Sequence, residues 1–220
     1  MPPAPFRYVA LGDSTAAGYG VGPAESYVAR TFARLRESRP DATLLNLGRN
    51  GATLRDLLGS QRGSQRGALA GLAPDLVTVS IGANDLWRRV PVDEFAAGLD
   101  ALGRALRELD AAVVVSNLPD LTRAPIAPAA ETWIGLSLDA IGRRVGLFNE
   151  AFREVARRHE LALFDLFDET RVALAEHPEY FGPDGFHPSA EGHAAWAAGL
   201  WPPLCEALER RARAARAPAG

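Results

Sequence analysis

Two short segments far apart in the chain contain the residue types that could cleave an ester. Ser14 follows Gly12 and Asp13 directly after an apolar run, where a strand-to-helix turn would expose its hydroxyl group. A serine hydroxyl is a weak nucleophile, so it needs an adjacent base, and that base needs a carboxylate to orient it. Asp184 and His187 are three residues apart before the predicted last helix, so they can face each other and leave the histidine Nε2 for Ser14. Together these side chains predict nucleophilic acyl transfer.

Two further positions could supply the hydrogen-bond donors that acyl transfer needs for its negatively charged oxygen. Gly48 follows the second apolar run, and Asn84 follows the third. A glycine N–H and an asparagine amide at strand ends are suitable donors, and the N–H of Ser14 is a third. Taken singly, Gly48 would be explained by a tight turn with positive φ, and Asn84 by an Asx turn. In the same way, Ser14 alone could be a cap, and His187 a turn residue bonded to backbone.

Short apolar runs alternate with amphipathic stretches along the chain, which is the pattern of strands alternating with helices. The predicted strands are 7–11, 43–47, 76–81, 112–115 and 161–164. The predicted helices are 26–39, 92–109, 136–159 and 189 to about 213, the last with Ser189 as its N-cap. Strict alternation predicts one α/β domain over residues 1–220, with a core at about 5–205, built on a parallel sheet that helices cover on both faces. Such sheets bind ligands beyond the C-terminal ends of their strands, where the polar positions named above lie.

The composition is that of a globular protein. Hydrophobic residues make up 47% and charged residues 23%, and the net charge of −3 argues against nucleic acid or an anionic membrane surface as a partner. The single cysteine, Cys205, cannot form an internal disulfide, and no Cys/His spacing resembles a metal site, so we expect neither a metal nor a cofactor. No signal peptide is visible at 1–6 and no apolar stretch approaches about 18 residues, so we expect a cytoplasmic location without membrane anchoring.

Three segments have no regular pattern. Residues 59–67 contain Gly-Ser-Gln-Arg twice in tandem, which we interpret as a duplicated loop. Residues 118–133 hold three prolines and are predicted to form a long surface loop beyond the fourth strand. The Arg- and Ala-rich tail over 206–220 is expected to fray after Glu209.

Several other polar and aromatic residues are assigned structural roles. His159 ends a predicted helix, where a partly charged imidazole meets the negative end of the helix dipole. His193 lies within the last helix and is the rival base, but no carboxylate precedes it by three residues. Asp13 is expected to hold the serine turn by accepting hydrogen bonds from local backbone N–H groups. Trp196 and Trp201 are assigned to the core.

Four segments, in this order and at this spacing, resemble the sequence blocks of the SGNH hydrolases, also called the GDSL esterase and lipase family. The segments are Leu11-Gly12-Asp13-Ser14, Asn46-Leu47-Gly48-Arg49-Asn50-Gly51-Ala52-Thr53, Ile81-Gly82-Ala83-Asn84-Asp85 and Asp184-Gly185-Phe186-His187-Pro188. The resemblance extends over nearly the whole chain. One departure is Asn50, which stands beside the candidate oxyanion glycine where many members have Ser, and it removes no catalytic role. Trp87, Arg88 and Arg89 are not specified by the motif and are expected to line or rim the pocket.

The resemblance implies a flavodoxin-like three-layer α/β/α sandwich whose five-stranded parallel sheet has the order 2-1-3-4-5. It implies that Ser14 is the nucleophile, that His187 is the general base and then the general acid, and that Asp184 orients His187. The N–H groups of Ser14 and Gly48 and the side chain of Asn84 would form the oxyanion hole. The expected activity is hydrolysis of carboxylic esters through an acyl-enzyme. Short-chain or acetyl esters are favoured because the small domain has no long apolar lid, and lysophospholipase or thioesterase activity is the alternative within the family.

Three other classes of protein fit the sequence less well. An α/β-hydrolase would need a serine in Gly-x-Ser-x-Gly, which the sequence lacks. A metallophosphatase also has Gly-Asp and Gly-Asn turns at strand ends, but it would need several His ligands. A flavodoxin-like module that binds a small molecule without catalysis is the non-enzyme alternative. Against it, Gly18, Gly20 and Gly22 lack the Gly-x-Gly-x-x-Gly spacing of dinucleotide sites.

Overall fold

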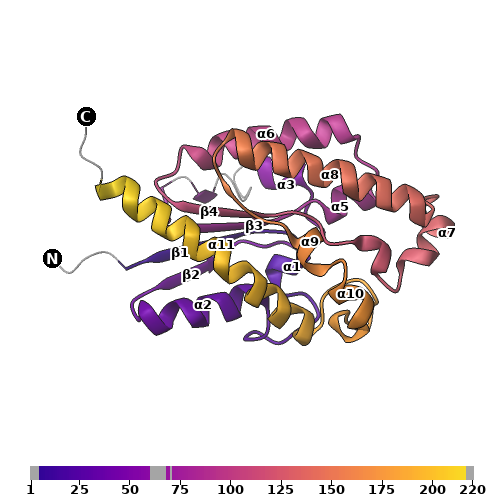
Figure 1. Ribbon diagram of the computed structural model, residues 1–220, viewed down its shortest axis with the longest axis horizontal. Helices are drawn as coiled ribbons and strands as arrows, with labels where there is room; N and C mark the ends of the chain where they lie inside the picture. Colours follow the sequence, from indigo (N-terminus) through magenta and orange to yellow (C-terminus); the bar gives the residue numbers. More distant parts are fainter. Residues whose placement is uncertain (1–4, 60–67, 70, 217–220) are drawn as a thin grey trace.

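A five-stranded parallel sheet lies at the centre of the molecule (Figure 1). The computed structural model describes residues 5–59, 68–69 and 71–216. The predicted order 2-1-3-4-5 is confirmed, and in the register Gly12 pairs with Ser80 and Ser80 with Ser116, so these three strands end at the same edge. In sheet order the strands are β2 (Thr43–Asn46), β1 (Arg7–Gly12), β3 (Leu76–Ser80), β4 (Ala112–Ser116) and β5 (Ala162–Phe164).

Helices cover both faces of the sheet, which gives the predicted three layers (Figure 1). One face is covered by α2 (Tyr27–Ser38) and α11 (Ala190–Arg216). The other is covered by α3 (Leu54–Leu58), α6 (Val92–Arg107) and α8 (Leu138–Arg158). The shorter helices are α1 (Ser14–Ala17), α5 (Ala83–Trp87), η1 (Leu121–Arg123), η2 (Ala127–Ala129), α7 (Ala130–Ile134), α9 (Leu166–Thr170), α10 (Ala173–Glu176) and η3 (Pro178–Tyr180). Within the described ranges, no helix is both long enough and apolar enough to cross a membrane.

Side chains that alternate along the strands divide the core into two layers. Val77 and Val79 of β3 belong to the layer beneath α6 and α8, where the rings of Phe95 and Phe148 stack with their centroids 4.0 Å apart. The layer beneath α2 and α11 contains Trp196, as predicted. β3 is buried along its whole length, as a parallel strand covered on both faces must be.

The segment 118–133 is not the surface loop that its prolines suggested. It forms η1, η2 and most of α7, and its Leu121, Ala124, Ala127 and Ala130 are buried in the core. These apolar residues recur every three positions, which places them on one side of successive short helical turns. The prolines therefore limit the length of each turn, but they do not keep the segment out of the core. The other predicted loop, the tandem Gly-Ser-Gln-Arg repeat, lies outside the described residues apart from its first glycine.

The C-terminal segment is helical, and the expected fraying of the tail was wrong within the described residues. α11 continues to Arg216. Arg211 anchors its last turns, because its Nη1 lies 2.8 Å from Asp75 Oδ1 and its Nε lies 3.3 Å from Asp110 Oδ1. These two carboxylates belong to loops that precede β3 and β4, so the helix end is tied to the sheet.

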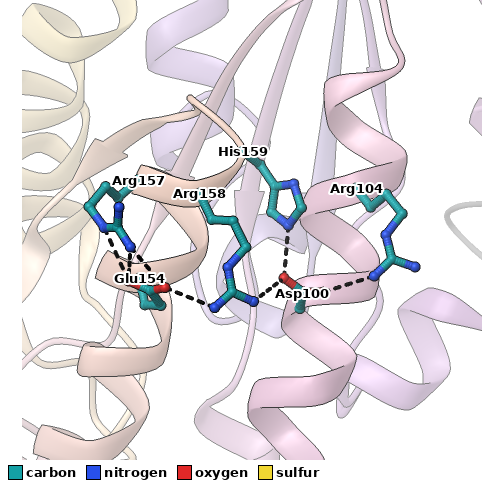
Figure 2. A network of polar contacts seen from close by, with 6 residues as sticks. All are labelled: Asp100, Arg104, Glu154, Arg157, Arg158 and His159. Atoms are coloured by element: carbon teal, nitrogen blue, oxygen red, sulfur yellow. Dashed lines mark hydrogen bonds and ion pairs between the residues drawn. The ribbon is translucent and has the colours of Figure 1, made fainter.

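A network of charged side chains links α6 and α8 (Figure 2). His159 follows the last residue of α8, as predicted, and its Nε2 lies 2.9 Å from Asp100 Oδ1 on α6. Asp100 also accepts hydrogen bonds from Arg104 at 3.0 Å and from Arg158 at 2.9 Å. Arg158 in turn pairs with Glu154 at 2.8 Å. Each arginine of this network therefore has a carboxylate partner.

Candidate active site

Ser14, His187 and Asp184 form one hydrogen-bonded line beyond the C-terminal end of β1. Ser14 is the first residue of α1, and its Oγ lies 2.8 Å from His187 Nε2. His187 Nδ1 lies 2.5 Å from Asp184 Oδ2. The fold thus brings the predicted nucleophile and base together across 173 residues of sequence. The order of the three groups is the one that a nucleophile, its base and an orienting carboxylate require.

The turn that carries Ser14 is shaped by the two residues before it. Gly12 has φ = 150°, and a Cβ at this position would lie 2.1 Å from the carbonyl oxygen of Ser80, so no larger residue fits. Asp13 is buried and caps α1, as expected, by accepting a hydrogen bond from the N–H of Thr15 at 3.0 Å. Burial raises the pKa of Asp13 to about 7. Backbone geometry and this cap together fix the direction of the nucleophile.

Asp184 is held by the backbone of the loop that follows it. Its Oδ1 accepts hydrogen bonds from the N–H groups of Phe186 and His187, each at 2.9 Å, while its Oδ2 faces the imidazole. Burial acts to raise the pKa of this carboxyl, but the hydrogen bonds from His187 and the backbone outweigh burial, and the pKa lies below its ordinary value. The loop ends at Ser189, which caps α11 as predicted by accepting a hydrogen bond from the N–H of Gly192 at 3.1 Å. Asp184 is therefore ionised beside the imidazole.

Asn84 lies in the first turn of α5, next to the loop that follows β2. Its Nδ2 donates a hydrogen bond to the carbonyl oxygen of Ala52 at 2.9 Å, and an amide nitrogen has a second hydrogen to donate. The neighbouring Asp85 is a residue to which we gave no role from the sequence. Asp85 is 2% exposed, and its carboxylate accepts hydrogen bonds from the N–H of Leu54 at 2.9 and 3.2 Å. Burial raises the pKa of Asp85 to about 6. These contacts of Asn84 and Asp85 tie the first turn of α5 to the segment at the start of α3.

Gly48 follows β2 and packs closely against α1. The structure does not give it the positive φ of a tight turn; instead, a Cβ would lie 2.5 Å from the backbone nitrogen of Ala17. Glycine is needed here because two backbones approach each other. The N–H of Gly48 donates to Asn46 Oδ1 at 3.0 Å, and Asn46 Nδ2 donates to the carbonyl oxygen of Ala16 at 2.7 Å. Asn46 thus fixes the loop against α1 and already holds the N–H that an oxyanion would use.

His193, the rival base, is placed elsewhere. It is buried in α11, and its Nδ1 accepts a hydrogen bond from the backbone N–H of Tyr27 at 3.1 Å. Burial lowers the pKa of His193 to about 4, so this imidazole is neutral at pH 7. His193 therefore has a structural role, and the imidazole that contacts Ser14 belongs to His187.

A cavity of about 360 Å³ with a mainly apolar wall opens beside His187. Trp133 on α7 is 67% exposed, so its ring borders both the cavity and solvent. Arg88 and Arg89 leave Trp87 in different directions: Arg88 Nη2 donates to the carbonyl oxygen of Gly51 at 3.0 Å, and Arg89 Nη1 to that of Ile134 at 3.2 Å. Segment 118–133, which we expected to be a surface loop, thus provides part of this wall. The lining residues are Trp87, Ile126, Ala130, Trp133, Ile134, Asp184, Phe186 and His187.

Comparison with known proteins identifies the family. The sequence profile of the GDSL-like Lipase/Acylhydrolase family matches residues 10–195. The arylesterase of Vibrio mimicus is 25% identical over 186 residues, which are 84% of this chain and 81% of that protein. The chain therefore belongs to the GDSL-like lipase and acylhydrolase family, as its four sequence blocks predicted, and it is a carboxylic-ester hydrolase.

Solved structures share the fold over almost the whole chain. LAE5, an alpha/beta hydrolase from the metagenome of Lake Arreo in Spain, matches with a TM-score of 0.71 at 25% identity, over 92% of this chain and 96% of that chain. Axe2, an acetylxylan esterase from Geobacillus stearothermophilus, matches with a TM-score of 0.66 at 22% identity, over 90% of this chain and 94% of that chain. These matches support the SGNH architecture of the sheet and its helices.

Proposed function

We propose that this chain hydrolyses short-chain or acetyl esters through an acyl-enzyme formed on Ser14. The observation that carries the proposal is the unbroken hydrogen-bonded line from Ser14 through His187 to Asp184, with distances of 2.8 and 2.5 Å. In such a line, the base is already in contact with the proton that it must accept.

Acylation would use each group in a separate role. His187 Nε2 accepts the proton of Ser14 as the Oγ attacks the ester carbonyl carbon, and Asp184 stabilises the imidazolium that forms. The carbonyl oxygen becomes negative beside the N–H of Ser14 and the second amide hydrogen of Asn84. The N–H of Gly48 joins them once it leaves or shares its hydrogen bond with the Asn46 side chain. His187 then donates its proton to the leaving oxygen, the alcohol departs, and the acyl group stays on Ser14.

Deacylation repeats the same transfers with water as the nucleophile. His187 accepts a proton from the water as its oxygen attacks the acyl carbon. The tetrahedral intermediate collapses, the bond to Ser14 Oγ breaks, and His187 returns the proton to the serine. The products are one carboxylic acid and the free enzyme.

The size of the cavity beside His187 supports a small substrate. At about 360 Å³ it lies near the lower end of ligand pockets, which run from roughly 300 to 1,000 Å³. Its apolar wall suits a short alkyl or aryl group rather than a highly polar one. The similarity to an arylesterase agrees with this size.

Ser14→Ala tests the mechanism directly. We expect kcat/KM for p-nitrophenyl acetate to fall by a factor of about 10⁴ or more, because no other group can form the acyl-enzyme. Mass spectrometry of the wild-type protein during turnover should show the addition of one acetyl group to the peptide that contains Ser14. Ser38→Ala, at an exposed position on α2, is the matched control and should behave like the wild type. Full activity of Ser14→Ala would overturn the proposal.

A panel of substrates tests the chain length. We expect p-nitrophenyl acetate and butyrate to be hydrolysed with higher kcat/KM than p-nitrophenyl octanoate, a long-chain acyl thioester or a lysophospholipid. A preference for any of the last three would overturn the short-chain assignment and leave the mechanism in place. Tight binding of a flavin or nucleotide without hydrolysis of any ester would instead favour a binding module.

A further inference from the structure

Arg89 bonds the part of the cavity wall that α7 forms, and Arg144 bonds the residue that follows Arg89. Arg89 donates from Nη1 to the carbonyl oxygen of Ile134, a residue of that wall, at 3.2 Å. Arg144 on α8 donates from Nη2 to the carbonyl oxygen of Val90 at 2.5 Å. Because Val90 directly follows Arg89, Arg144 is bonded to the short segment that carries Arg89.

Neither guanidinium is neutralised by the part of the chain that the structure describes. Arg89 and Arg144 form no ion pair there, although Glu131 on α7 and Asp139 on α8 belong to the same region. Burial, followed by the charge of Arg89, lowers the pKa of Arg144, as expected for a cation that has a second cation in its neighbourhood. The Nε of Arg144 is buried and has no hydrogen-bond partner among the described residues. An anion between the two groups would relieve both the repulsion and the unsatisfied donor.

The backbone of Arg89 adds an independent observation. Its φ is 56°, in the left-handed region that residues other than glycine seldom adopt. This conformation is strained and persists where the surrounding structure imposes it, which happens often at ligand sites. With this backbone, Arg89 bonds Ile134 on α7, whereas the neighbouring Arg88 bonds Gly51 after β2.

We propose that Arg89 and Arg144 form an anion subsite, and that the ester substrate carries a carboxylate or phosphate group on its apolar part. This inference rests on the proposed function, because Ser14 and His187 must hold the ester bond while the anionic end extends past Ile134 towards Arg89. Guanidinium groups bind carboxylate and phosphate oxygens through charge-assisted hydrogen bonds, and the mainly apolar wall from His187 to Ile134 suits an alkyl or aryl spacer. The substrate class is then an ester with an apolar body and an anionic end.

Two pairs of esters that differ by one methyl group test the subsite. In the first, 4-acetoxybenzoate and its methyl ester place the charge on the leaving group. In the second, mono-4-nitrophenyl adipate and its methyl ester place the charge on the acyl group. For each pair we would measure the ratio of kcat/KM for the anionic ester to kcat/KM for the neutral ester. The variants are Arg89→Gln and Arg144→Gln, with Arg143→Gln at an exposed position of α8 as the control.

We expect this ratio to fall about tenfold in Arg89→Gln and in Arg144→Gln for one of the pairs, because each substitution removes a hydrogen bond to a charged group. Arg143→Gln should leave the ratio unchanged. The pair that responds tells whether the alcohol or the acyl part of the substrate occupies the cavity. An unchanged ratio for both pairs in Arg89→Gln, whose side chain is exposed and whose folding is not at risk, would overturn the subsite.

A binding experiment separates this inference from the proposed function, since it needs no turnover. Adipate and 4-acetamidobenzoate would be titrated calorimetrically into the wild type, Arg89→Gln and Arg143→Gln. Weaker binding of at least one of these anions to Arg89→Gln alone would support the subsite even if no ester were hydrolysed. Equal affinity in all three proteins, or no binding to any of them, would overturn it.

Discussion

Two histidines of this protein each bond to an aspartate through a ring nitrogen, in two different parts of the fold. His187 Nδ1 lies 2.5 Å from Asp184, and His159 Nε2 lies 2.9 Å from Asp100. The first pair lies beyond the C-terminal end of β1, where the second ring nitrogen of the histidine meets Ser14. The second pair lies between α6 and α8 (Figure 2), and neither of its members contacts a nucleophile among the described residues.

The two aspartates differ in what surrounds their charge. Asp100 is shared between His159 and two arginines, so its charge is used to join two helices. Asp184 accepts hydrogen bonds from two backbone N–H groups and faces the imidazole of His187. Among the described residues, His187 is its ion-pair partner, so the cation that forms beside Asp184 during a reaction is the imidazolium. A His–Asp pair therefore indicates catalysis only when a nucleophile faces the free nitrogen and oxyanion donors lie nearby. Histidine alone, or its bond to a carboxylate, does not distinguish the two sites.

The largest expected effect comes from exchanging each histidine for glutamine. His187→Gln should lower kcat/KM for p-nitrophenyl acetate by a factor of about 10⁴ or more, because Ser14 loses its base. His159→Gln should keep the wild-type rate. Its Tm should fall by only a few degrees, since the glutamine amide can still bond to Asp100. Both variants would be assayed for rate and for thermal unfolding. The comparison breaks if His159→Gln is the inactive one or if His187→Gln keeps its rate.

Substituting the two aspartates should separate the catalytic pair from the structural pair in the same way, with a smaller effect on kcat/KM. Asp184→Asn should lower kcat/KM by a factor of about 10²–10⁴, because an amide neither stabilises the imidazolium nor favours the correct tautomer. Its fold should survive, since the amide oxygen can accept the same bonds from Phe186 and His187 that Oδ1 accepts now. Asp100→Asn should leave the rate unchanged. Steady-state kinetics together with far-UV circular dichroism check both variants, and an unchanged rate in Asp184→Asn would show that it does not orient the base.

Much of the difference between the two His–Asp pairs could be predicted, because it depends on local sequence patterns. The strands are apolar runs, and each candidate site residue follows a strand or precedes the last helix, so the sheet topology alone brings them to one edge. His159 could be assigned to a helix end by its place in the helical pattern. These features depend on neighbours in sequence or on the order of the strands.

Other features depended on contacts that no local pattern reveals. The Arg- and Ala-rich composition of the tail predicted fraying, and its partners Asp75 and Asp110, more than 100 residues away from Arg211, could not be foreseen. The apolar spacing of Leu121 to Ala130 was obscured by prolines, so its burial against the core was missed. Asn46 and Asp85 were read as parts of a motif, and only the folded loops show that Asn46 holds the N–H of Gly48 and that Asp85 holds that of Leu54.

The smallest effect concerns stability against pH, and it compares Asp100 with Asp13 beside the nucleophile. Burial raises the pKa of Asp13 to about 7, whereas the hydrogen bond from His159, followed by Arg158, lowers the pKa of Asp100. Asp13 therefore stabilises the fold most below its unfolded pKa, near 4, and this contribution is lost as pH rises through about 7. The contribution of Asp100 to stability changes with pH in the opposite direction. It is present above the pKa of the unfolded state and is lost as pH falls through the pKa of the folded state.

Denaturant unfolding from pH 4 to 8.5 should therefore separate two variants. Asp13→Asn should gain stability relative to the wild type as pH rises, by roughly 2–4 kcal/mol between pH 4 and pH 8. Asp100→Asn should lose stability relative to the wild type at pH 7 and approach it in acid. Since burial also raises the pKa of Asp85, the Asp13→Asn variant should keep part of the pH dependence of stability. If the free energy of unfolding depended on pH equally in the two variants, burial would not keep Asp13 protonated. The serine turn would then contain an ionised carboxylate at pH 5.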